Sequence, residues 1–301
     1  HTVATVSGVN YTVGGLASAM SGPAMAVAIG YALKCPPLVL FSLITVGFAS
    51  NALGGAGGPL AVYFVAIIAA EAGKMISKET KIDILVTPLV TIGVGTGVAA
   101  LIAPALGKAA MKIGELIMLA TNLQPFLMGI AVSVLVGIAL TLPISSAAIC
   151  AAFGLTGLAG GAAVAGCCAQ MVGFAVISYK ENGLGGLVSQ GIGTSMLQIP
   201  NIVKNWKIWI PPTLASVITG PISTVVFKMT NIPIGSGMGT SGLVGQIGTI
   251  TSMSADGRSL GVIYTSILLV HIILPAVLSY LFYIPMKKIG WIKDGDMKLN
   301  L

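Results

Sequence analysis

The chain contains long stretches without any charged side chain, and this feature limits its fold more than any other. Between Glu115 and Lys180, for example, there is no Asp, Glu, Lys or Arg. A charged side chain at bilayer depth costs several kcal/mol, so such residues are confined to the connections between membrane segments. Only 8% of the residues are charged and 55% are hydrophobic, whereas about 25% are charged in soluble domains. The charge-free stretches therefore predict membrane-embedded segments at residues 1–33, 35–70, 84–107, 116–179, 182–203, 208–227, 229–255 and 259–286.

Apolar runs between charges and prolines predict helices near residues 13–33, 37–50, 60–76, 84–106, 126–150, 209–227 and 260–284. Lipid offers no hydrogen bonds to the backbone, which favours helices, and each helical span requires roughly 20 apolar residues. We therefore predict an all-α polytopic membrane protein with about 8 to 11 membrane segments. His1 is followed by neither an initiator Met nor a signal-peptide pattern, so we expect the natural N-terminus to be missing.

The basic residues form small groups between apolar runs, although the net charge is +7. This arrangement is typical of anchoring beside the membrane and does not favour nucleic-acid binding. Short loops rich in Lys and Arg stay on the cytoplasmic side. We therefore predict that residues 74–81 and 204–207 are cytoplasmic, together with the tail lysines Lys287, Lys288, Lys293 and Lys298.

A catalytic site is not expected within this chain. The four cysteines, Cys35, Cys150, Cys167 and Cys168, lack the Cys-x-x-Cys spacing of zinc or redox sites and are interpreted as packing residues. No Ser, His and Asp occur in plausible proximity, and no soluble segment is long enough for an ATPase or kinase domain. Neither a cofactor nor a metal is predicted. Buried carboxylates for ion coupling are also lacking, since Glu71 and Glu115 lie near helix ends.

Three uncharged regions are unusual because Gly, Ser, Thr, Gln and Pro interrupt them: residues 141–179, 183–201 and 232–253. Broken helices at membrane depth are tolerated where protein or a water-filled cavity satisfies their backbone. Residues 189–196 also resemble residues 246–253, and residues 143–146 resemble 221–224, either as a structural repeat or by chance. In transporters, paired Gly- or Pro-interrupted segments point to the substrate site.

The polar residues of these regions are the candidate ligands of a small polar solute, because hydroxyls and amides replace hydration through neutral hydrogen bonds. Each has a structural alternative. Residues 191–201 either bind a solute or satisfy one another and cap a hairpin. Residues 233–253 either line a cavity or pack between helices. Gln170 either lines the cavity or joins two helices, and His271 is either a proton relay or a packed neutral group. The candidate substrate-binding residues are Thr194, Ser195, Gln198, Asn201, Gln170, Gln246, Thr249, Thr251 and Ser252.

Two segments resemble the membrane-spanning IIC subunits of the bacterial phosphoenolpyruvate-dependent sugar phosphotransferase system. They are residues 82–91 continuing to 102–107, and residues 191–206, which are similar to the family's Gly-Ile-Thr-Glu-Pro segment. Within this family, the chain is most similar to a divergent IIC-like group that includes the perfringolysin O regulator. The resemblance implies a homodimeric permease for a sugar or similar solute in the bacterial inner membrane, with two re-entrant hairpins. It divides the chain into a scaffold and oligomerisation part (1–140), a substrate-carrying part (141–256), and a final helix with a basic cytoplasmic tail (257–301).

The sequence departs from this family pattern at two places. Thr194 and Ser195 stand where the family has Thr-Glu, and the family's His has no counterpart between residues 142 and 171. Phosphorylation also requires separate IIA and IIB proteins as partners. Two hypotheses follow. The first is a transporter with elevator-type alternating access; the alternative is a membrane sensor derived from a IIC permease that signals to a cytosolic partner.

Overall fold

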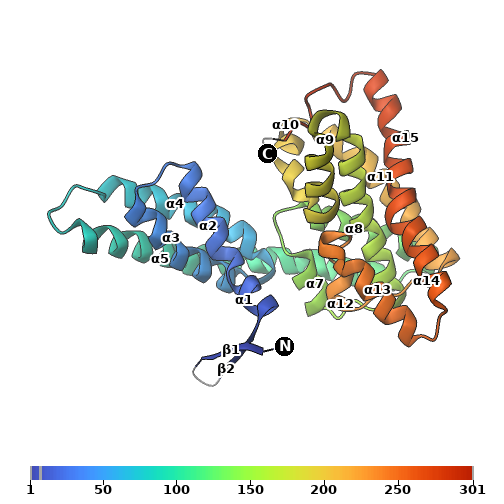
Figure 1. Cartoon of the computed structure of the whole chain (residues 1–301), viewed down its shortest axis with the longest axis horizontal. Helices are drawn as coiled ribbons and strands as arrows, with labels where there is room; N and C mark the ends of the chain where they lie inside the picture. The colour runs from blue at the N-terminus through green and yellow to red at the C-terminus, as the bar shows by residue number, and fades with distance from the viewer. Residues whose placement is uncertain (1, 7–8, 300–301) are drawn as a thin grey trace. The chain divides into compact units, whose positions relative to one another are not determined.

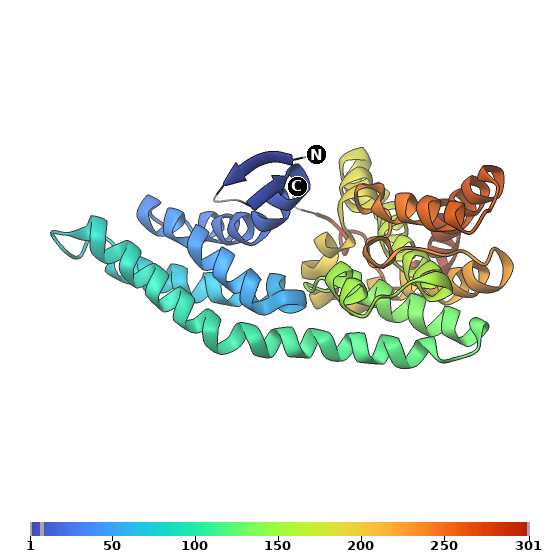
Figure 2. The same cartoon turned by 90° about the horizontal axis from the view of Figure 1, so that it is seen from below.

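The computed structural model describes residues 2–6 and 9–299, and the side chains of residues 15–299. Almost all of this part of the chain is helical (Figure 1). A short antiparallel hairpin of β1 (Thr2–Val6) and β2 (Val9–Thr12) precedes the helices. The chain forms two compact units, His1–Met111 (unit 1) and Lys112–Leu301 (unit 2). Their boundary lies inside the long helix α5 (Asp83–Thr121), which Figure 2 shows as one continuous helix.

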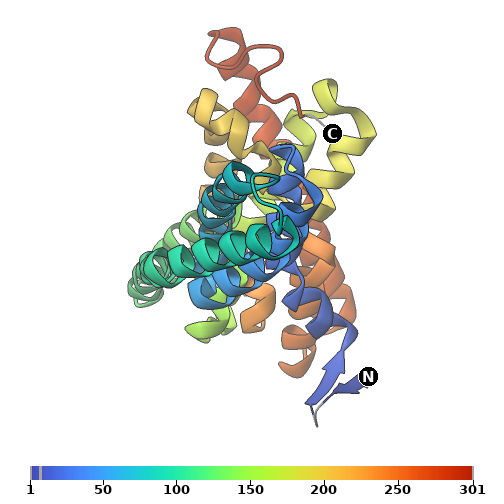
Figure 3. The same ribbon diagram turned by 90° about the vertical axis from the view of Figure 1, so that its left-hand side faces the viewer.

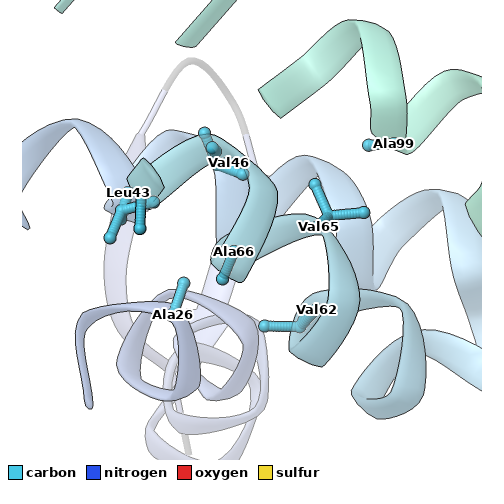
Figure 4. Packing of buried hydrophobic residues seen from close by; sticks show 9 residues of the cluster. Ala26, Leu43, Val46, Val62, Val65, Ala66 and Ala99 are labelled. Carbon is cyan, nitrogen blue, oxygen red and sulfur yellow. The ribbon is translucent and has the colours of Figure 1, made fainter. Parts of the chain in front are cut away.

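Unit 1 contains α1 (Val13–Ala19), α2 (Ser21–Ala32), α3 (Pro37–Gly54), η1 (Gly55–Gly57), α4 (Gly58–Ile76) and the first part of α5. Prolines occupy the first turns of α3 and α4, where a missing N–H costs nothing. Small and branched apolar side chains such as Ala26, Leu43 and Val65 form its core (Figure 4). A Cβ on Gly47 would overlap the main chain of α2 at Gly22, so these two helices cross in direct backbone contact.

Unit 2 continues with α6 (Pro125–Thr141), α7 (Ser146–Ala152), α8 (Gly157–Ile177), α9 (Tyr179–Val188), η2 (Ser189–Gly193), η3 (Ser195–Gln198), α10 (Ile199–Lys204), η4 (Trp206–Trp209), α11 (Ile210–Pro221), η5 (Ile222–Val226), α12 (Pro233–Ser236), η6 (Ser241–Leu243), α13 (Val244–Ala255), α14 (Leu260–Ser266), η7 (Ile267–Ile273) and α15 (Leu274–Lys288). Helix α8 lies at its centre, in contact with α6, α11 and α15. Its small residues allow this: a Cβ on Gly166 would overlap the Ser133 carbonyl of α6, and one on Gly173 would overlap the Ser279 hydroxyl of α15.

Five helical stretches of the described chain are long and apolar enough to cross a membrane: Pro37–Ile76, Asp83–Thr121, Gly157–Ile177, Trp206–Val226 and Leu260–Lys288. The first of them contains two helices, α3 and α4, which pack against each other around the turn at η1. The shorter helix α6 is also apolar. The prediction of an all-α polytopic membrane protein is therefore confirmed.

Several expected helices end earlier or later than the sequence predicted. The expected helix at residues 126–150 is divided into α6 and α7, because the chain turns at Pro143. The expected helix at 84–106 continues to Thr121 despite Pro88 and Pro104. The resemblance between residues 189–196 and 246–253 has no structural counterpart. The first stretch forms the π-helical turn η2 and a 3₁₀ turn, whereas the second lies in the regular helix α13.

Both polar regions after α8 are broken into short pieces. In the first region, Gly183 interrupts α9 with a φ of 60°, and η2, η3 and α10 follow. In the second, Gly239 and Gly242 also have positive φ angles of 55° and 52° between α12 and α13. L side chains rarely adopt this conformation, so glycine is favoured at such breaks, although Leu243 beside Gly242 also has a positive φ of 59°. The turns η2 and η6 contact each other, so the two broken segments meet within unit 2.

Candidate functional site

A cavity of about 690 Å³ lies in unit 2 between the first broken segment and the C-terminal tail. The broken segment supplies one side from η3 and α10, with Thr194 at the point where the chain extends between η2 and η3. The other side is formed by the tail after α15, which folds back toward α10 (Figure 3). The lining residues are Thr194, Met196, Leu197, Pro200, Asn201, Lys204, Gly295, Asp296, Lys298 and Leu299.

Buried amides form a continuous hydrogen-bond chain behind and along this cavity. Asn201 donates from Nδ2 to Oε1 of Gln198 (2.9 Å), and Gln198 donates from Nε2 to Oε1 of Gln190 (2.8 Å). Gln190 in turn donates to the Ser178 hydroxyl (2.9 Å) and to the carbonyl of Gly186 (2.9 Å). Because each amide fixes the next, the donors that reach the cavity are held in defined orientations. Gln190 was not among the sequence candidates, although it carries the only carboxamide side chain of the η2 turn.

Thr194 and Ser195, which are adjacent in sequence, have different environments. The Thr194 hydroxyl accepts a hydrogen bond from the Met196 amide (3.1 Å) and caps η3, and the residue lines the cavity. Ser195 is fully buried, and its hydroxyl lies 2.9 Å from the Thr141 hydroxyl at the end of α6. The Ser195 hydroxyl thus has a protein partner, and the residue does not line the cavity.

Gln170 joins two helices in the structure. Its Nε2 donates to the Thr213 hydroxyl (3.1 Å), and its Oε1 accepts from the indole Nε1 of Trp209 (2.9 Å). Both partners lie on the η4–α11 side of α8. The side chain is fully buried and does not line the cavity.

The candidates of the second segment do not share one environment. Thr251 is exposed and bonds only within its own helix, to the carbonyl of Ile247 (2.9 Å). Ser252 donates to the Thr230 hydroxyl (2.9 Å). Thr249 is buried and accepts a hydrogen bond from Asn231 Nδ2 (3.1 Å), a residue that the sequence analysis did not select. These three side chains therefore do not converge on the first segment.

Gln246 lies in a buried cluster with His271 and Cys168. Its Nε2 is 3.3 Å from Nδ1 of His271, which lies on the π-helical turn η7, and 3.4 Å from the Cys168 Sγ. Gln246 Oε1 and His271 Nε2 have no hydrogen-bond partner within the described part of the chain. Single π-helical turns occur frequently at functional sites. The three residues come from α8, α13 and η7, and none of them lines the cavity.

Two lysines and one carboxylate carry the charge at the cavity. Lys204 and Lys298 line it, whereas Asp296 accepts hydrogen bonds from Asn205 Nδ2 (2.7 Å) and from the Lys293 amide (2.8 Å). Closer to α15, the hydrogen bond from Lys287 holds the pKa of the Asp294 carboxyl below its ordinary value. The described residues contain no group of three or more His, Cys, Asp or Glu arranged to hold a metal ion. Neutral hydrogen-bond donors with basic residues beside them suit a polyhydroxylated solute.

The chain matches a protein-family model described as "Phosphotransferase system, EIIC" over residues 2–299. No curated protein matches it. No solved structure matches it either.

Proposed function

Because the chain belongs to the EIIC family of the phosphotransferase system, and is thus a multi-pass membrane component of sugar transport, we propose that the cavity of unit 2 binds the transported sugar. The observation that carries this proposal is the position of the cavity. It lies on the segment, residues 191–206, that resembles the sugar-binding segment of the family. Its volume of about 690 Å³ falls in the usual range for small-molecule sites, roughly 300 to 1,000 Å³.

Within this site, the Asn201 amide and the Thr194 hydroxyl are the proposed direct contacts. Gln198 is completely buried and is not a proposed contact of the sugar. Its Oε1 accepts a hydrogen bond from Asn201 and so orients the Asn201 amide. Gln170, Gln246, Thr249, Thr251 and Ser252 remain sequence candidates, but they do not line this cavity. A sugar presents several hydroxyls that both donate and accept, which matches a row of carboxamides and hydroxyls.

Transport by this site requires that it open alternately to the two sides of the membrane. We place the movement in unit 2, because the broken segments there contain the glycines with positive φ at which the backbone bends. Unit 1 is the proposed scaffold of a homodimer. Its α3 and α4 expose large apolar side chains, among them Phe41, Phe48, Tyr63 and Phe64, that suit lipid or a second copy of the chain.

Separate IIA-like and IIB-like proteins are the proposed phosphoryl donors on the cytoplasmic side.

A sensor that binds sugar without transporting it is the second candidate function. The specific observation in its favour is Ser195, whose hydroxyl is bonded to Thr141 and takes the place of the expected carboxylate. Loss of that acceptor weakens sugar binding, and a sensor tolerates weak binding better than a concentrating permease.

Counterflow in proteoliposomes tests the proposal. The purified protein is reconstituted and assayed with radiolabelled hexoses, hexitols and N-acetylhexosamines, with and without added IIA and IIB proteins. We expect saturable counterflow of at least one of these sugars. The Asn201→Ala variant should bind that sugar roughly tenfold more weakly, the loss of about one hydrogen bond. The control Asn122→Ala changes an exposed residue between α5 and α6 and should behave like the unmodified protein. Saturable binding without counterflow would instead support the sensor.

A further inference from the structure

The chain after α15 forms an irregular tail that is attached to the first broken segment (Figures 1 and 3). It turns at Gly290 and Gly295, whose φ angles are 76° and 94°. Two of its side chains, Ile292 and Met297, are almost completely buried against Phe174 and Ile177 of α8 and neighbouring residues. The tail, defined here as residues 291–299, is therefore held at fixed points without being part of a helix.

The main chain of this tail is bound by side chains of α9. Asn182 donates from Nδ2 to the carbonyl of Met297 (2.8 Å) and accepts from the amide of Leu299 (2.7 Å). Glu181 accepts from the amide of Met297 (3.0 Å). These contacts recognise main-chain groups of the tail through side chains, in the manner in which a groove binds an extended peptide.

Two further bonds connect the tail to the proposed sugar site. The carbonyl of Met297 accepts from Gln198 Nε2 (3.0 Å), and the carbonyl of Lys298 accepts from Asn201 Nδ2 (3.0 Å). A sugar hydroxyl oxygen near Asn201 would accept the same hydrogen bond that the Lys298 carbonyl accepts. The Lys298 carbonyl therefore occupies a donor that a bound sugar would otherwise use, and the Met297 carbonyl holds the Gln198 amide that orients Asn201.

We propose that the tail, which also forms one side of the cavity, is a built-in competitor of the sugar: its Lys298 carbonyl occupies the Asn201 donor in the resting protein and is displaced when a sugar binds tightly. This inference rests on the proposed function, because it concerns the same cavity. The tail can leave without breaking a helix, since its attachment consists of hydrogen bonds, two buried apolar side chains and a cation–π contact of Lys207 with Trp291. In the sugar-bound protein, the amides of Met297 and Leu299 lose their acceptors on Glu181 and Asn182.

A reversible disulfide tests whether the tail must move. Asn205 donates to Asp296 over 2.7 Å, so the two short side chains face each other. The double variant Asn205→Cys/Asp296→Cys is made in a Cys35→Ser protein, because the other native cysteines are buried. We expect the oxidised double variant to bind and exchange the sugar found in counterflow at least tenfold less well than the same variant after reduction. The reduced variant is the reference because Asp296 lines the cavity and is replaced in both forms. The single variant Asn205→Cys controls for loss of the asparagine. Unchanged counterflow in the oxidised protein would overturn the proposal.

The opposite change should strengthen sugar binding. Asn182→Asp retains the shape of the side chain but removes its donor to Met297, and Asn182 does not line the cavity. We expect the dissociation constant for the sugar to fall roughly threefold to tenfold, the effect of about one hydrogen bond. Asn122→Asp adds the same charge at an exposed site and should leave the constant unchanged.

Hydrogen–deuterium exchange of the unmodified protein provides a readout without mutation. Addition of the sugar should accelerate exchange at the amides of Met297 and Leu299, and added protection there would contradict displacement. The outcomes also separate the two proposals. Counterflow that responds to neither the disulfide nor Asn182→Asp removes only the competitor tail. Absence of sugar binding in every one of these proteins removes the sugar site and the competitor with it.

Discussion

Gly166 lies in the middle of α8, where a Cβ would overlap the main-chain carbonyl of Ser133 on α6. Helices in membranes pack through small residues, because lipid supplies no hydrophobic force that would bring larger surfaces together. Glycine at this position therefore sets the distance between α6 and α8.

We expect Gly166→Ala to lower the free energy of unfolding by about 1 to 3 kcal/mol, since the overlap forces the two backbones apart. Unfolding of the purified protein in detergent by a denaturant measures this loss. Gly261→Ala is the matched control, because the helix α14 has open space around Gly261. A loss of the same size in both variants would show that alanine acts through the helix backbone and not through the contact with Ser133.

Cys35 is the one cysteine of the four that is not buried. Partial burial raises the pKa of its thiol above the ordinary value of 9.0. A raised pKa leaves less thiolate at pH 7, so reaction with a maleimide should be slow there. Its rate should rise about tenfold per pH unit up to at least pH 9, because only the thiolate reacts.

Mass spectrometry after labelling of the folded protein checks this prediction. One maleimide should be added to the native protein and four after denaturation, which matches the four cysteines of the sequence. The Cys35→Ser variant should gain none in the native state. Labelling of Cys167 or Cys168 without denaturation would contradict the packing around α8.

Some of the candidate residues chosen from the sequence line the cavity and others do not. The difference is the direction in which each side chain points. Thr194 and Asn201 stand out as polar residues in an uncharged run, and both line the cavity. Thr251 stands out equally, yet it is exposed. Which side of a broken helix faces the interior depends on its neighbours in space. The same limit applies to Asn182, whose partner is a tail residue more than a hundred positions away along the chain.

At the level of elements, the sequence predicted where the helices break but not how they break. Clusters of Gly, Ser and Pro at residues 183–201 and 232–253 indicated interrupted helices, and both regions consist of short pieces. The three π-helical turns η2, η5 and η7 have no such signal. Each of these turns contacts α8. A π-helical turn contains one residue more than an α-helical turn and is stabilised by packing against a neighbouring helix. The local pattern of residue types along the sequence does not show that packing.

The second broken segment depends on Asn231, which is buried at its start. Its Nδ2 donates to the carbonyl of Gly245 (3.0 Å) and to the Thr249 hydroxyl (3.1 Å), and its Oδ1 accepts from the amide of Ile232 (2.7 Å). We expect Asn231→Ala to destabilise the protein by about 1 to 3 kcal/mol, because buried partners lose their hydrogen bonds. Denaturant unfolding in detergent measures the difference.

Two variants sharpen this measurement. Asn231→Asp retains the acceptor for Ile232 but loses both donors, so it should also destabilise the segment. Thr251→Ala on the same segment removes an exposed hydroxyl that bonds only within α13 and should have little effect. Equal stability of Asn231→Ala and Thr251→Ala would show that Asn231 does not hold the segment.

For the whole molecule, the confinement of charge was sufficient to predict a polytopic helical membrane protein, because the cost of burying ions applies to any fold. The functional division at residues 140 and 256 stays a prediction. The two compact units meet at Met111 and Lys112 inside one helix, and sequence cannot show where a continuous helix changes its packing partners. Compactness alone also does not identify the part that moves.

The membrane topology is the remaining whole-molecule prediction. Basic loops favour the cytoplasm, so the tail after α15 should face inward. The stretch Leu260–Lys288 has 29 residues and, at about 1.5 Å per residue, exceeds the hydrocarbon core of roughly 30 Å. We therefore expect it to cross the membrane once, which would place the exposed Ser254 before it on the outer side.

Labelling with a membrane-impermeant maleimide tests this topology in variants of a Cys35→Ser protein that each carry one added cysteine, since the three remaining native cysteines are buried. In intact cells, Ser254→Cys should react and Lys293→Cys should not, whereas inside-out vesicles should give the reverse result. Lys78→Cys should behave like Lys293→Cys, because residues 74–81 form the other basic loop predicted to be cytoplasmic. Reaction of Ser254→Cys and Lys293→Cys from the same side would mean that α14 to α15 enters the membrane and returns. In that case the positions of the basic residues would no longer indicate that the competitor tail faces the cytoplasm, where the IIA and IIB proteins are proposed to act.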